Sequence, residues 1–221
     1  MRIKEGPRRI AANASLLPVQ LRFKTGLTGK EYVNAKAWRL ASLPHCPEHG
    51  PDSNCDFHRN GTYARKTPPG TRIARWYCRD AHRTWSVLPD HLAARLPGPL
   101  RDVEEVIASV EQAKSLQRQA QELRKVIMAP GAVRWVDRRL SAVRQLLPRV
   151  IELVPQLLRD CVPTIGSVRK CLGCECVLME LRELAADHLQ QLRPPLGFRP
   201  PPYAQSPFQQ RTGLDPPAQP A

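Results

Sequence analysis

The stretch HCPEHGPDSNCDFHRNGTYARKTPPGTRIARWYCRDAHRTW, residues 45–85, decides the fold predicted for the first half of the chain. Cys46-Pro-Glu-His49 holds two metal-binding side chains at a spacing that lets one tight turn aim both at a single ion. Cys78 and His82 form a second pair. Two thiolates and two imidazoles complete a tetrahedral zinc site with no open position, which is typical of a structural site. We therefore expect Zn²⁺ bound by Cys46, His49, Cys78 and His82.

Strand and turn signals fill the interval between the two pairs. Asn60-Gly61 favours a two-residue hairpin turn. Residues 62–63, 73–77 and 84–86 are rich in β-branched and aromatic side chains, which favour strands. A short antiparallel sheet that carries two metal-binding turns is a zinc ribbon. Such a sheet has little core of its own, so metal binding would largely drive its folding.

Other ligands are available in the same stretch. Cys55-Asp-Phe-His58 is a further pair, and either side chain could replace a member of the set above. His45 directly precedes Cys46, so we expect it to point away. A third interpretation is that these thiols and imidazoles bind no metal. The residues alone leave the choice among these sets open.

Residues 100–192 have the apolar spacing of helices, with breaks at Leu-Pro-Gly-Pro (96–99) and Met-Ala-Pro-Gly (128–131). We predict a helical bundle over 100–192 that contains a helix-turn-helix-like segment over 115–147. A plain bundle with a solvated basic surface is the alternative.

The expected recognition helix is 132–147, where apolar residues recur at spacings of three and four. Arginines on its other faces would reach guanine edges near the helix start and phosphates further along. Arginines on the ribbon strands would hold phosphates. The expected buried face is Val133, Val136, Leu140, Val143 and Leu147, and the expected nucleic-acid-binding residues are Arg65, Arg72, Arg75, Arg134, Arg138 and Arg139.

Four further cysteines follow in the helical region. Cys161, Cys171, Cys174 and Cys176 could suggest a second metal site. Several of them fall on one helical stripe with apolar neighbours, and a free cysteine in such a place is a small buried hydrophobe. We expect core packing, with metal binding or a redox role for Cys171-Leu-Gly-Cys174 as alternatives.

The charge points to a polyanionic partner. The chain carries 34 Lys and Arg against 20 Asp and Glu, a net charge of +14, and 23 prolines. This excess favours nucleic acid or an anionic membrane surface, and we expect double-stranded DNA. Residues 1–40 are expected to form a basic arm, residues 41–95 the zinc ribbon, and residues 194–221 a Pro-rich disordered tail.

Membrane insertion and export are not expected. No run of about 20 apolar residues occurs. The apolar stretch near the N-terminus is interrupted by Pro18 and Gln20, and no small-residue cleavage site follows it. Seven cysteines, an odd and clustered set, favour a reducing compartment. We expect a cytoplasmic, nucleoid-associated protein.

Over residues 44–90 the chain resembles the zinc ribbon that opens many bacterial insertion-element transposases. That family usually has CPxC, an NG turn, an aromatic-rich strand into CxxC and a Thr–aromatic pair. Here His49 stands at the second ligand place and Ala81 at the fourth, with His82 one position later. The motifs that carry the resemblance are CPEH (46–49), NGTY (60–63), RWYC (75–78) and HRTW (82–85).

The segments SLQRQAQELR and GAVRWVDRRLSAV likewise resemble the helix-turn-helix of insertion-element proteins. The resemblance implies a DNA-recognition module of a mobile element, whose partner would be a separate transposase or another protein. Transposase chemistry itself is not expected. It needs three acidic residues on a ribonuclease-H-like mixed sheet, whereas the pattern after residue 90 predicts helices and a Pro-rich tail.

The sequence therefore predicts a non-enzymatic α+β protein. A small zinc-ribbon β domain precedes a mostly helical bundle and a Pro-rich tail. No phosphate-cradling Gly loop, Ser nucleophile elbow or HExxH motif occurs. One alternative is a protein-interaction adaptor whose Pro-rich tail binds a partner groove. The other is an RNA-binding protein in which Tyr63, Trp76 and Tyr77 stack on bases.

Overall fold

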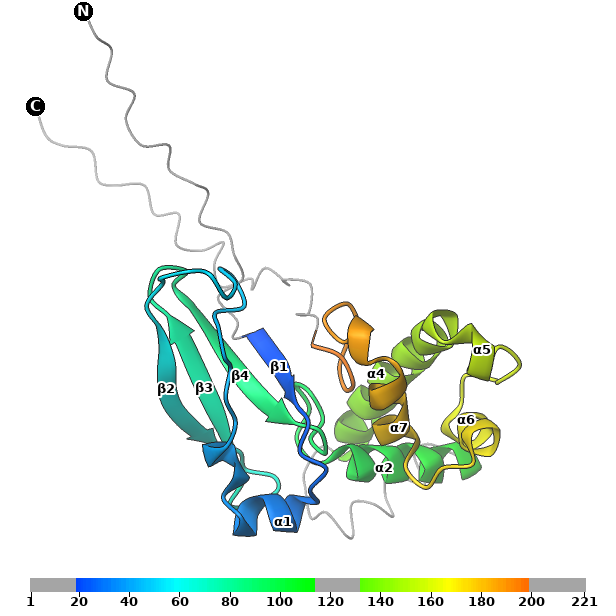
Figure 1. The fold of residues 1–221 in the computed structure, drawn as a ribbon. Helices are drawn as coiled ribbons and strands as arrows, with labels where there is room; N and C mark the ends of the chain where they lie inside the picture. Colours follow the sequence, from blue (N-terminus) through cyan, green and yellow to red (C-terminus); the bar gives the residue numbers. More distant parts are fainter. Residues whose placement is uncertain (1–18, 114–131, 199–221) are drawn as a thin grey trace, which may run out of the picture. The chain divides into compact units, whose positions relative to one another are not determined.

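A computed structural model describes residues 19–113 and 132–198 of the chain (Figure 1). Its strands form one sheet and are followed by several helices, so the predicted α+β class is confirmed. Helix α4 (Ala132–Leu153) contains the predicted recognition helix and extends beyond it through Pro148. The helix and turn expected to precede it, residues 115–131, lie outside the described residues.

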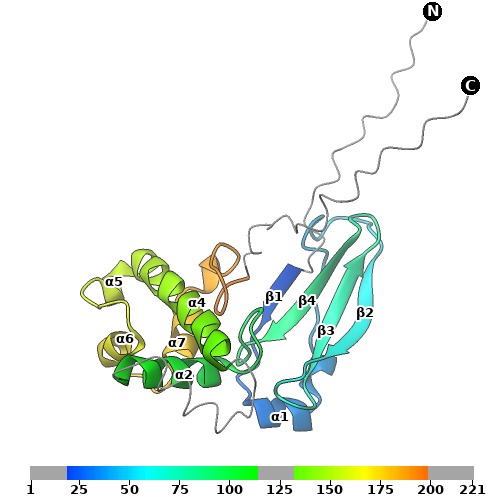
Figure 2. The same cartoon turned by 180° about the vertical axis from the view of Figure 1, so that it is seen from behind.

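The sheet has the strand order β1-β4-β3-β2, and Figures 1 and 2 show it from its two sides. β2 (Phe57–Ala64), β3 (Arg72–Cys78) and β4 (Arg83–Pro89) pair antiparallel in chain order. β1 (Val19–Phe23) joins β4 in parallel. β3 and β4 contain the strand segments expected from the sequence. β1 was not expected, because it comes from the segment assigned to a basic arm.

Asn60 and Gly61 do not form the expected hairpin turn. They lie inside β2, at a bulge where the pairing with β3 shifts. Gly61 has a φ of +66°, which a glycine adopts without strain. A bulge and a hairpin turn both accept a glycine with positive φ, so the dipeptide alone does not separate them. The connection between β2 and β3 is the longer segment 65–71.

Two short helices lie at one end of the sheet (Figure 1). α1 (Gly29–Asn34) begins with a capping box in which Thr28 and Glu31 bond each other's backbone amides. It is followed by η1 (Ala37–Arg39), a single 3₁₀ turn. Tyr32 in α1 is fully buried, and its hydroxyl donates to the carbonyl of Arg72 at 3.0 Å. This bond ties the helical segment to the start of β3.

The remaining helices pack around a hydrophobic core that also includes Ile73 and Leu88 of the sheet. Val136, Leu140, Val143 and Leu147 of α4 are buried in it as expected, whereas Val133 is 47% exposed and does not face the core. Val133 lies in the first turn of α4, before the buried stripe begins. The helices are α2 (Leu100–Gln112), α4, α5 (Pro155–Leu158), α6 (Ile165–Leu172), α7 (Val177–Leu184) and the 3₁₀ turn η2 (Ala186–His188).

The first five residues of the expected disordered tail, 194–198, belong to this core. Leu196 and Phe198 are buried, and the guanidinium of Arg182 lies 5.7 Å from the ring centre of Phe198. Arg182 is itself buried and donates four hydrogen bonds to backbone carbonyls, including those of Pro195 and Leu196. The expectation of disorder therefore does not hold for 194–198, and the tail from 199 onward lies outside the described residues.

The second cysteine group is not the continuous buried stripe that was expected. α6 ends at Leu172, and Gly173 has a φ of +60° that turns the chain before α7 begins. Cys161 and Cys171 are joined by a disulfide. Cys174 and Cys176 are free and partly exposed, and the Cys176 thiol donates to a carboxylate oxygen of Glu104 at 3.3 Å.

Candidate metal centre

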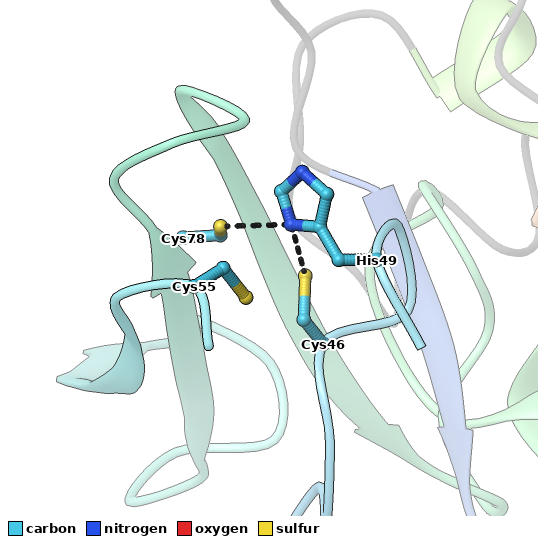
Figure 3. Close-up of side chains that lie close together, drawn as sticks. All are labelled: Cys46, His49, Cys55 and Cys78. Carbon is cyan, nitrogen blue, oxygen red and sulfur yellow. Dashed lines mark hydrogen bonds between the residues drawn. The ribbon is translucent and has the colours of Figure 1, made fainter. Parts of the chain in front are cut away.

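Four metal-binding side chains converge at one end of the sheet. Cys46, His49, Cys55 and Cys78 place their ligand atoms within 4.8 Å of one another (Figure 3). The Nδ1 atom of His49 lies 3.5 Å from the sulfur of Cys46 and 3.5 Å from that of Cys78. Sulfurs bound to one tetrahedral zinc lie about 3.8 Å apart, given Zn–S bonds of about 2.3 Å. The group is therefore close to the size that a metal ion requires.

The first turn of the site brings Cys46 and His49 together. The amide of Gly50 donates to the carbonyl of Cys46 at 2.8 Å and closes the turn. Gly50 has a φ of +80°, a conformation that favours glycine. Cys46 and His49 point into one space as a result, and the sequence prediction for this pair agrees with the geometry (Figure 3).

The second turn follows β3 and contributes one ligand. Cys78 is the last residue of β3, and the amide of Ala81 donates to its sulfur at 3.4 Å. Ala81, three residues after Cys78, occupies the place where a second ligand of this turn would stand. His82 comes one residue later with a φ of 47° and is exposed. The structure does not bring His82 into the group.

Cys55 is the fourth member in place of His82, an alternative that the sequence had left open. Its segment is tied to the second turn: the Asp80 carboxylate accepts from the amide of Asp56 at 2.8 Å, and the amide of Arg79 donates to the Asp56 carbonyl at 2.9 Å. These bonds hold Cys55 beside Cys78. His58 is directed elsewhere, since its Nδ1 lies 2.9 Å from the Asp56 carboxylate.

The site is buried on the side of the thiols and open on the side of the imidazole. Cys46 is 2% exposed and Cys78 is fully buried, whereas His49 is exposed. Trp85 is buried with the two cysteines, and the rings of Phe57 and Trp76 stack beside them at 5.2 Å. This aromatic wall shields the sulfurs of Cys46 and Cys78 from water.

The environment of the thiols fits a cation. Burial raises the pKa of the Cys78 thiol. Burial also opposes ionisation of Cys46, but backbone hydrogen bonds from His49 and Glu48 hold its pKa below the usual value. Several thiolates in so small a volume would repel one another strongly. A divalent ion would remove that repulsion, and its binding would release the thiol protons.

Two of the arginines expected to bind nucleic acid are engaged within the protein. Arg65 donates to the carbonyls of Ala93 and Leu96, and burial lowers its pKa. Arg139 is only 4% exposed, lies 3.5 Å over the ring of Trp135 and donates to the carbonyl of Pro97 at 2.8 Å. The carbonyl partners lie about 30 to 40 residues away in the sequence, so the arginine pattern alone could not reveal them.

Three of the other four arginines have exposed side chains. Arg72, Arg134 and Arg138 are exposed, and Arg75 is partly buried with no partner for its Nε atom in the described part of the chain. Of the aromatic residues proposed to stack on RNA bases, Trp76 is packed on Phe57 and Tyr63 against the main core.

Neither a protein-family model, nor a curated protein, nor a solved structure matches this chain. Among residues 19–113 and 132–198, no helix has the length and apolar character needed to cross a membrane.

Proposed function

We propose that this chain is a non-catalytic DNA-binding protein stabilised by a structural zinc ion, and that it is related to the recognition modules of mobile elements. Three thiolates and one imidazole suit zinc, and four protein ligands leave no position for a reactive water. The ion would fix the two turns and the start of β2. Its proposed role is to hold the ribbon in shape, and the proposed location of the protein is the nucleoid.

The observation that carries the DNA proposal is the exposed side of α4. Arg134, Arg138 and Arg144 are exposed there, and none of them forms an ion pair within the described residues. The opposite side of the helix is held in the core by its apolar stripe. A rigid helix that presents unpaired arginines is suited to a DNA groove, where guanidinium groups bind guanine edges and phosphates.

Arg149 on the same helix provides a matched control. It is also exposed, but its guanidinium donates to the Glu152 carboxylate at 2.8 Å. Its charge is therefore already compensated by the protein. If α4 enters a groove with its first turns, removal of Arg134 or Arg138 should affect binding more than removal of Arg149.

The test measures the affinity of the zinc-loaded chain for a selected duplex and for random duplex at several salt concentrations. Arg134→Ala or Arg138→Ala should cost about 1–3 kcal/mol on the selected duplex if the arginine pairs with guanine. The cost on random duplex should be smaller, and Arg149→Ala should have little effect on either. No salt-dependent binding to any duplex would overturn the proposal in favour of the adaptor. Tighter binding to single-stranded RNA would favour the RNA alternative.

A further inference from the structure

A second group of exposed cations lies around η1 and the sheet edge. Lys36 precedes this 3₁₀ turn and Arg39 ends it, Arg59 belongs to the edge strand β2, and Arg72 begins β3. All four are exposed. We call Lys36, Arg39, Arg59 and Arg72 the basic patch. Only Arg72 was among the residues expected from the sequence to bind nucleic acid.

Arg59 is held in place by backbone groups. Its guanidinium donates to the carbonyl of Arg39 at 2.8 Å and to that of Trp38 at 2.5 Å. The bonds anchor the arginine at the end of η1, next to the main chain of Arg39. Carbonyls carry no net charge, so the positive charge of Arg59 is not compensated by them.

Arg72 is oriented in a similar way. Its Nε atom donates to the hydroxyl of Thr62 at 2.8 Å, which leaves both terminal nitrogens of the guanidinium available. In the sheet, Thr62 pairs with Ala74 and Arg59 pairs with Trp76, so both lie on one face of β2. Arg72, whose Nε atom bonds Thr62, therefore lies on the same face of the sheet as Arg59.

No member of the basic patch forms an ion pair with a carboxylate of the described residues. Elsewhere on the sheet, Arg83 pairs with Glu48 at 2.6 Å and Arg22 with Asp90 at 2.6 Å. Glu31, the acidic residue nearest to η1 in the helix before it, caps its own helix. None of these four charges is therefore compensated by a carboxylate of the described residues, and a polyanion would compensate them.

We infer that the basic patch is a second DNA contact, which binds the phosphodiester backbone of duplex DNA without reading bases. This inference rests on the proposed function. The oriented guanidinium of Arg72, with both terminal nitrogens free, matches the paired oxygens of a phosphate, and the fixed charge of Arg59 adds to the attraction. The exposed Leu40 beside the patch makes an anionic membrane the competing partner. One leucine offers little apolar area for insertion into lipid, so the charge pattern favours DNA.

The experiment removes two charges from the patch without touching a described side-chain hydrogen bond. Lys36→Asn keeps a residue that tolerates the left-handed conformation found there, with φ 49°. Combined with Arg39→Gln, it should lower the slope of log affinity against log salt on random duplex by about 1.8, because each lost phosphate contact removes about 0.9. The matched control, Arg83→Gln with Arg101→Gln, removes two charges that are paired with Glu48 and Glu175.

Zinc content and circular dichroism establish that each variant is folded. If the wild-type chain binds duplex DNA and Lys36→Asn/Arg39→Gln shows the same salt slope, the basic patch is not a DNA contact. The proposed role of α4 would stand in that case. Failure of the wild-type chain to bind duplex at all would overturn the proposed function as well. If the variant loses binding to vesicles of anionic phospholipid and keeps its affinity for DNA, the patch is a membrane contact and the inference is wrong.

Discussion

The choice between Cys55 and His82 as the fourth metal ligand can be decided by substitution. The structure places the Cys55 sulfur within 4.8 Å of the other three ligand atoms and leaves His82 outside this group. We therefore expect Cys55→Ser to weaken zinc binding and His82→Asn to leave it unchanged. Asparagine is chosen because His82 has a φ of 47°, which asparagine accepts better than most residues.

The expected size of the effect follows from the number of ligands. Structural zinc sites bind with about 10–16 kcal/mol of apparent free energy, so one ligand of four accounts for about 2.5–4 kcal/mol. This corresponds to a loss of roughly two to three powers of ten in affinity. Cys78 is fully buried and Cys55 only partly, so Cys78→Ser should lose at least as much.

Competition with a chromophoric chelator gives the affinity, and cobalt substitution gives the ligand set. The thiolate-to-cobalt charge-transfer absorbance should fall by about a third in Cys55→Ser, since three thiolates become two. Circular dichroism of each zinc-loaded variant controls for folding. Wild-type affinity in Cys55→Ser together with weak binding in His82→Asn would refute the Cys₃His assignment and restore the set expected from the sequence.

Two further predictions concern the buried groups of the main core. Arg182→Met removes a donor from four backbone carbonyls and leaves three of them with none, since that of Pro195 keeps the amide of Ala94. The free energy of unfolding should therefore fall by about 4 kcal/mol in urea titrations, whereas the exposed control Arg149→Met should change it little. His91 is 7% exposed, and burial lowers its pKa to about 4. Its folded pKa lies below the unfolded value of about 6.5, so its contribution is complete above pH 6.5 and is lost as the pH falls toward 4. Between pH 7 and pH 4.5 the wild type should therefore lose about 2 kcal/mol more than His91→Phe, and equal losses in the two proteins would exclude this role for His91.

The sequence predicted the parts of the fold that depend on local spacing. The turn holding Cys46 and His49, the strands ending at Cys78 and starting near Thr84, and the buried stripe of α4 all follow from short-range patterns. β1 was missed, because its pairing with β4 joins residues more than 60 positions apart. A five-residue strand at a sheet edge carries too weak a pattern to be recognised without its partner.

The error over His82 has a local physical cause. The spacing of three residues between Cys78 and His82 was accepted as a variant of the usual spacing of two. In the structure the turn closes with an amide-to-sulfur bond from Ala81, and this geometry directs the position three residues after Cys78 toward the site. A ligand one position later lies beyond the turn. Cys55 replaces it through backbone bonds between Asp56 and the second turn, which no spacing rule contains.

Arg65 and Arg139 show a second limit of prediction from the sequence. Charged residues are expected at the surface, so Arg65 and Arg139 were taken as DNA contacts. Both instead donate to carbonyls in the segment 93–97, which links the sheet to the helices. A connecting segment without regular structure has unpaired carbonyls, and arginine can satisfy several of them at once. Basic side chains near such a segment are therefore candidates for internal bonding.

The hydrophobic cluster at the candidate metal centre is separate from the main core, and this separation indicates which part of the fold a metal ion would stabilise. The residues packed around Cys46 and Cys78 form a cluster of their own, whereas Ile73 and Leu88, further along the same strands, belong to the large core shared with the helices. The sheet is thus held at one end by the helical core, and the candidate metal centre lies at the other end. The isolated ribbon expected from the sequence would depend on zinc for folding. In the structure, the helical core supplies apolar burial to β3 and β4 whether or not the ion is bound. A bound zinc ion would therefore act mainly on the two turns, on the start of β2 and, through β2, on the position of Arg59.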